Sequence, residues 1–337
     1  LCPFVNYSGK HRSFLEIHLA KSRAVMKKYQ TEIPHILTTS YLTHSPIQKQ
    51  VDIHNHYEYE GILALSPGRF ISHRLIPMVR DLMFLWEEMP QEILDENKQK
   101  VREAVREALK NWARTRGEGN FYTDNIPLQR FNPPGHFYEI PNLLQNGVLA
   151  DILKKQPSLK YLLVHNIDTL GASVDAGILG LHIESGKSMS FEVIPRRFED
   201  RGGGLAKVNG QVRLLEGLAQ PRESDEFKLR FYNSLTTWID IDPMLHLFGL
   251  TRNDLYGQPE KVSAAVRHMA ARVPTYVTIK EVKRRWGHGQ EDVFPVAQFE
   301  KLWGDVTSLA ETSFFYMVVP RLRGQQLKDP SQLDAWA

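Results

Sequence analysis

The fold is decided by the stretch Leu159-Lys160-Tyr161-Leu162-Leu163-Val164, which is followed by polar residues. A nearly continuous apolar run of this length is typical of a central strand that is covered on both faces. Short apolar runs of this kind recur along the chain with helical segments between them, at residues 36–39, 62–65, 190–194, 212–215, 227–232, 238–241, 275–279 and 314–319. This alternation predicts an α/β fold with a mixed, mainly parallel sheet between helices.

Two helices stand out in the pattern. Residues 14–29 follow Ser13, a favourable N-cap, and carry Glu16 at the third helical position and Lys27 and Lys28 near the end. A second helix is predicted from about Gln91 to Arg114, because one apolar residue recurs about every 3.6 positions while the other face is charged. Its apolar positions are Leu94, Val101, Val105, Ala108 and Trp112.

Composition places the chain among ordinary globular proteins. Of its 337 residues 42% are hydrophobic and 24% are charged, which excludes disordered, collagen-like and coiled-coil classes. The net charge of 42 − 39 = +3 is a small electrostatic footprint and argues against a nucleic-acid partner. A single cysteine, Cys2, excludes an intrachain disulfide, and no apolar run approaches the ~18 residues of a membrane-spanning helix.

We therefore expect a soluble, cytoplasmic protein without a membrane partner. Because the first residue is Leu1 rather than Met, we expect the numbering to begin inside a longer natural chain. A targeting segment upstream of Leu1 stays an open alternative.

Several familiar site types find no support. There is no G-x-x-x-x-G-K-[ST] loop and no G-x-G-x-x-G, so P-loop and dinucleotide-binding classes lack their phosphate cradles. His44, His54 and His56 have no further ligand in a matching pattern, and a surface strand is favoured over a metal site. The basic run from Lys280 to Trp286 is interpreted as a solvated helix face rather than a nucleic-acid patch.

Three polar loops are candidate sites, namely residues 133–136, 166–172 and 200–204. In open α/β sheets ligands bind beyond the carboxyl ends of the strands, which suits Asp168 after the run 159–164. Asp168 either meets a ligand or metal there or orders its own turn. The glycines at 202–204 either let backbone approach a ligand or form a bland hairpin. His136 either donates to a phosphate or is merely exposed.

Taken in order, these segments resemble the UDP-glucose pyrophosphorylase family of UTP:glucose-1-phosphate uridylyltransferases. The similarity covers roughly residues 10–335 and is strongest at residues 131–241. The motifs that carry it are Phe14-Leu15-Glu16, residues 36–41, Pro133-Pro134-Gly135-His136, residues 166–172, Gly202-Gly203-Gly204, residues 212–216 with 219–221, Phe231-Tyr232-Asn233-Ser234 through Trp238, residues 276–280 and Gln298-Phe299-Glu300.

The resemblance implies a Rossmann-like, GT-A-like nucleotidyltransferase fold. The implied reaction joins UTP to a sugar 1-phosphate, with glucose 1-phosphate expected, and gives UDP-glucose and pyrophosphate with Mg²⁺ as cofactor. By the family pattern, the expected nucleotide contacts are Gly135, His136 and Asp168, and Asp168 is also the expected metal ligand. The expected sugar contacts are Gly203, Glu216, Asn233 and Ser234. The expected catalytic lysines are Lys280 and Lys328, and Arg321 and Arg323 are alternatives to Lys328.

The chain also departs from the family. The glycine-rich triphosphate loop, Gly-Gly-x-Gly, does not occur, and its place would be immediately before residue 1, so we expect weak activity from this chain alone. The uracil-reading glutamine has no counterpart, and only Ser66 lies nearby. The helix around 91–114 resembles an insertion that serves a protein partner or a lid. The family's C-terminal β-helix is missing.

We therefore expect a catalytic-type core at residues 1–242 with the inserted helix near 91–114, and the remainder of the core at residues 243–337. Two further hypotheses stay open. One is an inactive sugar-nucleotide-binding relative that acts as a structural or regulatory subunit, favoured by the missing glycine loop. The other is a nucleic-acid-binding module on the 280–286 basic run, which the small net charge disfavours.

Overall fold

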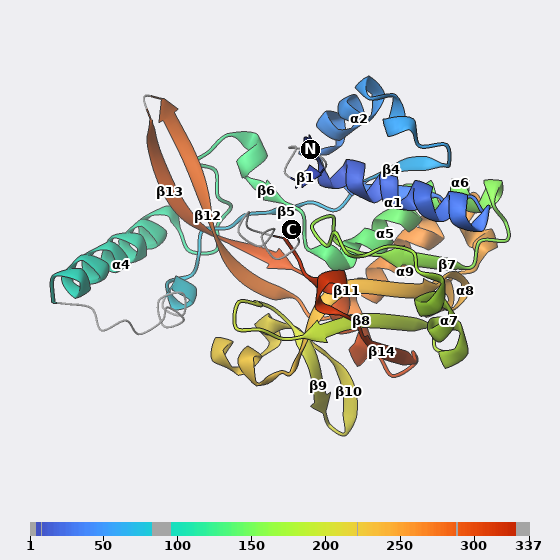
Figure 1. The fold of residues 1–337 in the computed structure, drawn as a ribbon. Helices are drawn as coiled ribbons and strands as arrows, with labels where there is room; N and C mark the ends of the chain where they lie inside the picture. The colour runs from blue at the N-terminus through green and yellow to red at the C-terminus, as the bar shows by residue number, and fades with distance from the viewer. Residues whose placement is uncertain (1–4, 8, 83–95, 221, 288, 328–337) are drawn as a thin grey trace. The chain divides into compact units, whose positions relative to one another are not determined.

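The computed structural model describes residues 5–7, 9–82, 96–220, 222–287 and 289–327 (Figure 1). The chain forms two compact units. Unit 1 comprises Leu1–Arg69, Phe137–Pro274 and Leu302–Ala337, and unit 2 comprises Phe70–His136 and Thr275–Lys301. The sequence-based boundary after residue 242 falls inside unit 1, within helix α8 (Ile241–Leu247), because strands on both sides of it pair in one sheet.

Besides α8, the described α-helices are α1 (Phe14–Tyr29), α2 (His44–Ile53), α4 (Glu96–Arg116), α5 (Glu139–Gln145), α6 (Val148–Lys155), α7 (Ala176–Ser185), α9 (Pro259–Arg272) and α10 (Arg321–Gly324). The strands are β1 (Val5–Tyr7), β2 (Lys10–Arg12), β3 (His35–Thr39), β4 (Leu63–Pro67), β5 (Ser72–His73), β6 (Phe131–Asn132), β7 (Tyr161–Val164), β8 (Met189–Pro195), β9 (Gly204–Val208), β10 (Gln211–Leu215), β11 (Phe231–Asp240), β12 (Tyr276–Gly287), β13 (Gln290–Glu300) and β14 (Phe314–Val318).

The main sheet of unit 1 has the order β10-β9-β11-β8-β14, with β7 also paired to β11 (Figure 1). Only the β8–β14 pair in this sheet is parallel; its other described pairs are antiparallel. The α/β class is therefore confirmed, but the expectation of a mainly parallel sheet is wrong. One reason is local: Asn209 and Gly210 both have positive φ, which suits the tight hairpin turn between β9 and β10. A two-residue turn can join only antiparallel strands.

Strand β7 does not take the central place that its apolar run predicts. All of its residues are half-buried, and among the described strands it pairs with β11 alone. The buried strand is β11, which runs from Phe231 to Asp240 as one element with a bulge after Asn233 and so joins the end of the predicted run 227–232 to most of the run 238–241. The bulge lets a single long strand change its pairing, and this the apolar pattern does not reveal.

Helix α1 forms as its capping signals predict. The Glu16 backbone N–H donates to Ser13 Oγ at 3.3 Å, and the Ser13 N–H donates to Glu16 Oε2 at 2.8 Å, which completes a capping box. The helix packs against α2, β3 and β4 through a core that includes the fully buried Leu19 and Val51. Strands β3 and β4 form a separate parallel pair.

A second core of unit 1 joins the main sheet to α7. Trp238 of β11, Ile194 of β8 and Met317 of β14 pack with Ile178 and Leu179 of the helix. Trp238 is buried to 2% exposure, so its indole anchors this layer. The sheet that carries the candidate sugar residues is thus backed by packed apolar side chains.

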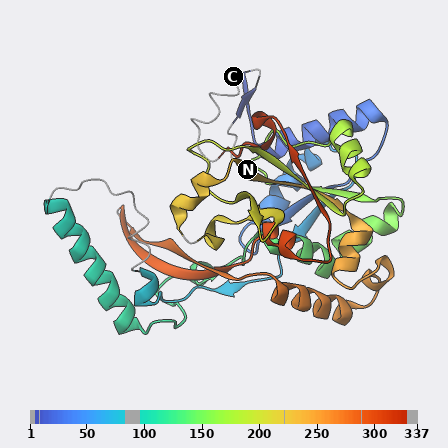
Figure 2. The same ribbon diagram turned by 90° about the horizontal axis from the view of Figure 1, so that it is seen from below.

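Unit 2 is built on the hairpin of β12 and β13, a long curved ribbon (Figure 2). The prediction of a basic helix face at 280–286 is wrong, because this segment lies in β12. Its side chains follow the two-residue period of a strand, with Val282 buried and its neighbours Glu281 and Lys283 exposed.

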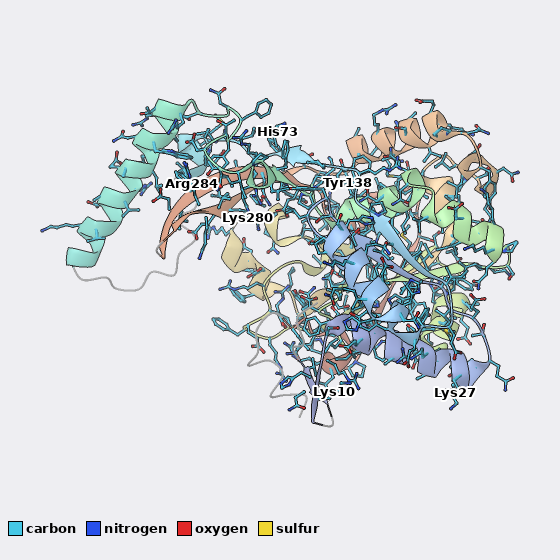
Figure 3. The ribbon with its side chains drawn as sticks, turned by 90° about the horizontal axis from the view of Figure 1, so that it is seen from above. Lys10, Lys27, His73, Tyr138, Lys280 and Arg284 are labelled. Atoms are coloured by element: carbon cyan, nitrogen blue, oxygen red, sulfur yellow. The ribbon has the colours of Figure 1, made fainter. Side chains whose placement is uncertain are left out.

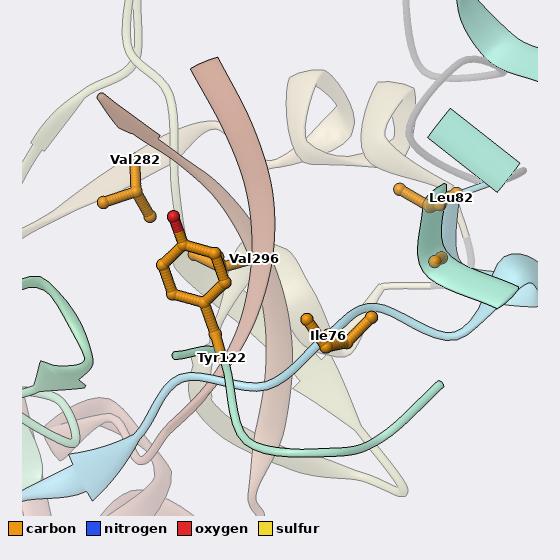
Figure 4. Close-up of a cluster of buried hydrophobic side chains, with 6 residues drawn as sticks. Ile76, Leu82, Tyr122, Val282 and Val296 are labelled. Atoms are coloured by element: carbon orange, nitrogen blue, oxygen red, sulfur yellow. The ribbon is translucent and has the colours of Figure 1, made fainter. Parts of the chain in front are cut away.

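Helix α4 of unit 2 begins at Glu96 in the described chain and ends at Arg116, two residues beyond the predicted end. The predicted start at residues 91–95 lies outside the described residues. Its C-terminal half covers the ribbon: Leu109, Trp112 and Ala113 pack with Val282 and Val296 in the cluster that Figure 4 shows in part. None of the described helices combines the length and apolar character that crossing a bilayer requires.

Strand β13 offers a matched test of this cluster. Val296 is fully buried in it, whereas Val293 of the same strand is 45% exposed. Val296→Ala should lower the free energy of unfolding by roughly 2 kcal/mol, because two buried methyl groups and their contacts are lost. Val293→Ala makes the same change in strand propensity and should stay within about 0.5 kcal/mol of the parent. Urea unfolding followed by tryptophan fluorescence measures both, and equal losses would contradict the packing described.

Candidate functional site

The predicted site residues divide between the two units. Unit 1 holds Asp168, Gly203, Glu216, Asn233 and Ser234; unit 2 holds Gly135, His136 and Lys280; Lys328 lies outside the described residues.

Unit 1 brings Gly203, Glu216 and Asn233 together with Gly304, and we call these four residues the Glu216 cluster. A Cβ at Gly203 would lie 2.8 Å from Glu216 Oε2, and a Cβ at Gly304 would clash with Glu216 Oε1 and lie 3.5 Å from Asn233 Nδ2. Neither glycine has a positive φ, so each is required for space rather than for backbone conformation. The carboxyl group is thus inserted between two glycine backbones.

The Glu216 carboxyl is buried and forms no ion pair with any described residue. The side chain is 6% exposed, and its Oε1 has no hydrogen-bond partner within the described chain. Burial raises the pKa of Glu216 to about 8, and the nearby Asp305 carboxylate raises it as well, while the Gly304 backbone N–H acts in the opposite direction. Glu216 is therefore protonated at neutral pH and can both donate and accept a hydrogen bond.

The bulge of β11 shapes the other side of this cluster. Asn233 Oδ1 accepts the Leu235 N–H at 3.0 Å, and Leu235 has the left-handed φ of 62° that the bulge imposes. Ser234 is fully buried, and its hydroxyl donates to the Glu192 backbone carbonyl at 2.7 Å. The hydroxyl of the nearby Thr236 is also buried.

The glycine loop, residues 200–204, is fixed by charged side chains. Arg196 donates to the carbonyls of Gly202 and Gly203 at 2.8 and 2.9 Å. Arg321 binds both carboxylate oxygens of Asp200, at 2.7 and 2.8 Å. Such bidentate pairs hold their geometry well, so the backbone of Gly203 is held against Glu216.

Arg323, the other rival of Lys328, is also engaged. Its guanidinium binds both oxygens of Glu192, at 2.6 and 2.8 Å, and Glu192 is fully buried. Both arginines therefore serve ion pairs within unit 1. Which of Lys328, Arg321 and Arg323 meets a phosphate stays a prediction.

The Asp168 loop, residues 166–173, connects β7 to α7. Asp168 is half-buried, whereas its neighbour Thr169 is fully buried. A Cβ at Gly171 would lie 2.5 Å from Arg323 Cα, so the loop packs directly on α10. Burial raises the pKa of Tyr232, and the Asp200, Asp168 and Glu216 carboxylates all raise it further. Asp168 and the Glu216 cluster thus share one electrostatic environment.

In unit 2 the loop 133–136 lies against the end of β13. Gly135 has φ 96°, and a Cβ there would lie 2.8 Å from the Lys301 backbone nitrogen, so conformation and space both require glycine. The Lys301 N–H donates to the Pro134 carbonyl at 2.8 Å. Burial lowers the pKa of His136 to about 4, against the opposing charge of Glu300, so the imidazole is neutral at pH 7.

Glu300 also faces Lys280, which projects from the hairpin in Figure 3. The Lys280 Nζ lies 3.9 Å from Glu300 Oε1, while Thr278 and Gln298 donate to the same oxygen at 3.0 and 2.8 Å. Lys280 is 52% exposed, so its ion pair is loose. Unit 2 therefore brings His136 and Lys280 to one carboxylate.

Ser66, the His182–Ser190 pair and clusters of metal-binding side chains give little support for a further functional site. Ser66, near the expected place of the uracil-reading residue, is fully buried and accepts a hydrogen bond from Asn146 at 2.7 Å. His182 lies 2.7 Å from Ser190 Oγ and 3.8 Å from Asp240, but Ser190 is fully buried and no substrate can reach it as a nucleophile. Within the described ranges no three His, Cys, Asp or Glu side chains form a group that could hold a metal ion.

Comparison with known proteins places this arrangement in a family. The family model described as UTP–glucose-1-phosphate uridylyltransferase matches residues 88–257, half of the chain. The chain belongs to the UTP–glucose-1-phosphate uridylyltransferase family. It is 27% identical over 241 residues to the Hordeum vulgare enzyme of this name, covering 70% of this chain and 42% of that protein. The Saccharomyces cerevisiae uridylyltransferase is 36% identical over 127 residues, covering 36% of this chain and 25% of that protein.

Solved structures agree on the fold. The Trypanosoma brucei protein described as UDP-glucose phosphorylase has a TM-score of 0.60 at 19% identity, covering 97% of this chain and 58% of that chain. A point mutant of Leishmania major UDP-glucose pyrophosphorylase, in complex with UDP-glucose, has a TM-score of 0.58 at 18% identity, covering 97% and 59%. The chain spans less than half the length of the uridylyltransferases matched by sequence.

Some residues that shape the candidate site are not among those that the sequence predicts. Glu192 was visible as one charge inside the apolar run 190–194, and Asp305 as one acid beside the apolar Leu302-Trp303. Gly304 carried no local signal, because its role depends on Glu216, far away in the sequence. Arg196 likewise acts only on backbone carbonyls, which no residue pattern marks.

The buried acid gives a test by pH. The pKa of Glu216 is higher in the folded chain than its ordinary value of 4.5, so the native state holds a proton that the unfolded state releases. Stability from this proton is present below pH 4.5 and is lost as the pH rises toward 8. Relative to the parent, Glu216→Gln should therefore gain stability over this range by at most about 1.4 kcal/mol per pH unit.

Thermal unfolding between about pH 5 and 8 measures this difference. Glu184→Gln, an exposed change on α7, is the control and should parallel the parent at every pH. A Glu216→Gln curve that also parallels the parent would mean that this carboxyl is ionised in the folded protein.

Proposed function

We propose that this chain is the catalytic-type core of a uridylyltransferase that joins UTP and a sugar 1-phosphate, glucose 1-phosphate first, to give a UDP-sugar and pyrophosphate. A Rossmann-like, GT-A-like nucleotidyltransferase fold belongs to this proposal. Family membership supports it, and so does the complex of a relative of similar fold with UDP-glucose. The observation that carries it in this chain is the Glu216 cluster, in which a buried acid and an amide are held beside two glycine backbones.

The cluster suits recognition of neighbouring sugar hydroxyls. Each hydroxyl is both donor and acceptor, and the protonated Glu216 together with the Asn233 amide offers both kinds of group. A site built to bond hydroxyls rejects ligands that lack them, because its buried polar groups would then stay unpaired. We assign Gly203, Glu216 and Asn233 to sugar binding, and Ser234 to the shape of the bulge.

The proposed chemistry is a single in-line displacement. A phosphate oxygen of the sugar 1-phosphate attacks the α-phosphorus of UTP, a new P–O bond forms, and the bond to the bridging oxygen breaks so that pyrophosphate leaves. Gly135 and His136 are assigned to the nucleotide and Lys280 and Lys328 to the phosphates. A lysine beside these oxygens offsets the negative charge that builds up in the transition state.

The donor set fits a Mg²⁺ ion that arrives with the phosphates. Magnesium is commonly bound by one or two carboxylates together with substrate phosphate oxygens and water, and the half-buried Asp168 can supply one carboxylate. The ion when bound would neutralise phosphate charge. We assign Asp168 to this place and to the nucleotide phosphates.

A protein contact at α4 is the second part of the proposal. Val101 is 64% and Val105 45% exposed, and they continue the apolar stripe whose later members Leu109 and Trp112 are packed in unit 2. Exposed apolar side chains in register with a buried stripe are the feature that supports a partner there.

The test of function uses the whole natural protein. Calorimetry with magnesium measures binding of UDP-glucose, UTP and a non-uridine sugar nucleotide, and a coupled assay measures pyrophosphate release from UTP and glucose 1-phosphate. Binding with release is the expected result. Binding of UDP-glucose without release would favour the inactive, regulatory relative, and absence of both would overturn the proposal.

Asp168→Ala should lower turnover by at least about 100-fold, because the carboxylate that meets the metal and phosphates is lost. The fold should persist, with circular dichroism and the unfolding midpoint close to the parent. Asp151→Ala removes an exposed carboxylate of α6 and should leave turnover unchanged. An Asp168→Ala variant with parental turnover would remove this residue from the mechanism.

A further inference from the structure

The Asp168 loop is held in place chiefly by donors from other elements. Within the loop, the Thr169 N–H donates to the Asn166 carbonyl and the Ala172 N–H to the Thr169 carbonyl, both at 3.1 Å. Five carbonyls of the loop accept hydrogen bonds from other elements. Their donors are His18 Nε2 for Ile167 (2.8 Å), the Leu327 N–H for Asp168 (2.9 Å), Lys21 Nζ for both Leu170 and Ala172, and Arg323 Nη2 for Ser173 (2.9 Å).

Lys21 is the member of this set that no motif marks. It comes from α1 and bonds two carbonyls of the loop at once, at 2.5 Å in the case of Ala172. No carboxylate lies within 4.0 Å of its ammonium group in the part of the chain that the structure describes. The two carbonyl dipoles therefore take the place of a counterion.

The surroundings of Lys21 disfavour its charged form. Burial, and then the charge of Arg323, lower the pKa of Lys21 to about 8, so it is still protonated at pH 7. His18, His35 and His165 lie close by, and burial is the main cause that lowers their pKa values to about 2, 4 and 4. They are neutral at pH 7. Lys21 is thus a half-buried cation whose partners are loop carbonyls.

We propose that Lys21 is a positioning residue. By binding the backbone carbonyls of Leu170 and Ala172 it fixes the conformation of the Asp168 loop and so determines the position of the Asp168 carboxylate. The two bonded carbonyls, of Leu170 and Ala172, follow Asp168 by two and four residues, whereas the anchor from Leu327 is at Asp168 itself. Lys21 thus holds the part of the loop that follows Asp168, and its removal leaves the carbonyls of Leu170 and Ala172 without the donor that fixes them. The effect on turnover rests on the proposed function, whereas the effect on the loop does not.

Lys21→Met tests the inference directly, because methionine keeps a long flexible stem and removes the donors. Hydrogen exchange read by mass spectrometry on the whole protein should show amides of residues 166–173 exchanging at least about tenfold faster. Peptides of β8 and β11 should exchange at the parental rate. Lys21→Arg keeps a cationic donor and should restore most of the protection.

Lys27→Met is the matched control, since Lys27 is exposed near the end of the same helix (Figure 3). It should leave the exchange of the loop unchanged. Parental exchange of the loop in Lys21→Met would overturn the inference. An equal increase over loop and sheet would also overturn it, because Lys21 would then be a general stabiliser of unit 1.

Turnover provides the second measurement. In the whole natural protein Lys21→Met should lower kcat by about 10- to 100-fold while the KM for the sugar phosphate changes by less than about threefold, as expected for misplacement of a catalytic group. A rise in KM with unchanged kcat would contradict a positioning role. If the parent protein has no turnover, the proposed function fails, and the exchange experiment alone decides the role of Lys21.

Discussion

The fully buried carboxylate of Glu192, on β8, is the interaction on which the candidate site of unit 1 depends. It accepts hydrogen bonds from Trp238 of β11 at 2.8 Å and from Arg323 at 2.6 and 2.8 Å. Its backbone carbonyl accepts the Ser234 hydroxyl. Removing one partner of a buried ion pair typically costs about 3–5 kcal/mol, because the other charge stays buried and uncompensated. Sheet, bulge and α10 are therefore held together at one point.

That rigid frame explains how Glu216 Oε1 can remain without a hydrogen-bond partner among the described residues. A buried carboxyl oxygen without a partner costs free energy that the surrounding structure must offset. The site tolerates it because Gly203 is fixed by Arg196 and the bulge at Asn233 is fixed by its own hydrogen bonds. Polar groups kept in place before a ligand arrives need little reorganisation when it binds. The cost in stability is thus consistent with a binding site rather than a structural core.

Sequence patterns were reliable where the physics is local. The capping box at Ser13 and Glu16 depends on residues three apart, and helix α1 begins where it predicts. They failed where the outcome depends on distant partners: β7 lies beside β11 alone in the described sheet, although its apolar run resembles a central strand. The motif around Glu216 marked a candidate sugar residue, but Gly304 could be found only from the fold, because it meets that carboxyl 88 positions later in the chain.

The candidate phosphate-binding cations, taken each within its own unit, differ in whether they are available to a ligand, and their ion-pair partners decide this. Arg323 is bound to a carboxylate with no exposure, so withdrawing it would leave a buried charge behind. Lys280 is half-exposed and 3.9 Å from its partner, and such pairs contribute only about 0–1 kcal/mol. A phosphate can therefore draw Lys280 away from Glu300 at little cost, whereas it cannot recruit Arg323. Three basic side chains with the same formal charge thus divide into one ligand-ready group, Lys280, and two structural ones, Arg323 and the Asp200-bound Arg321.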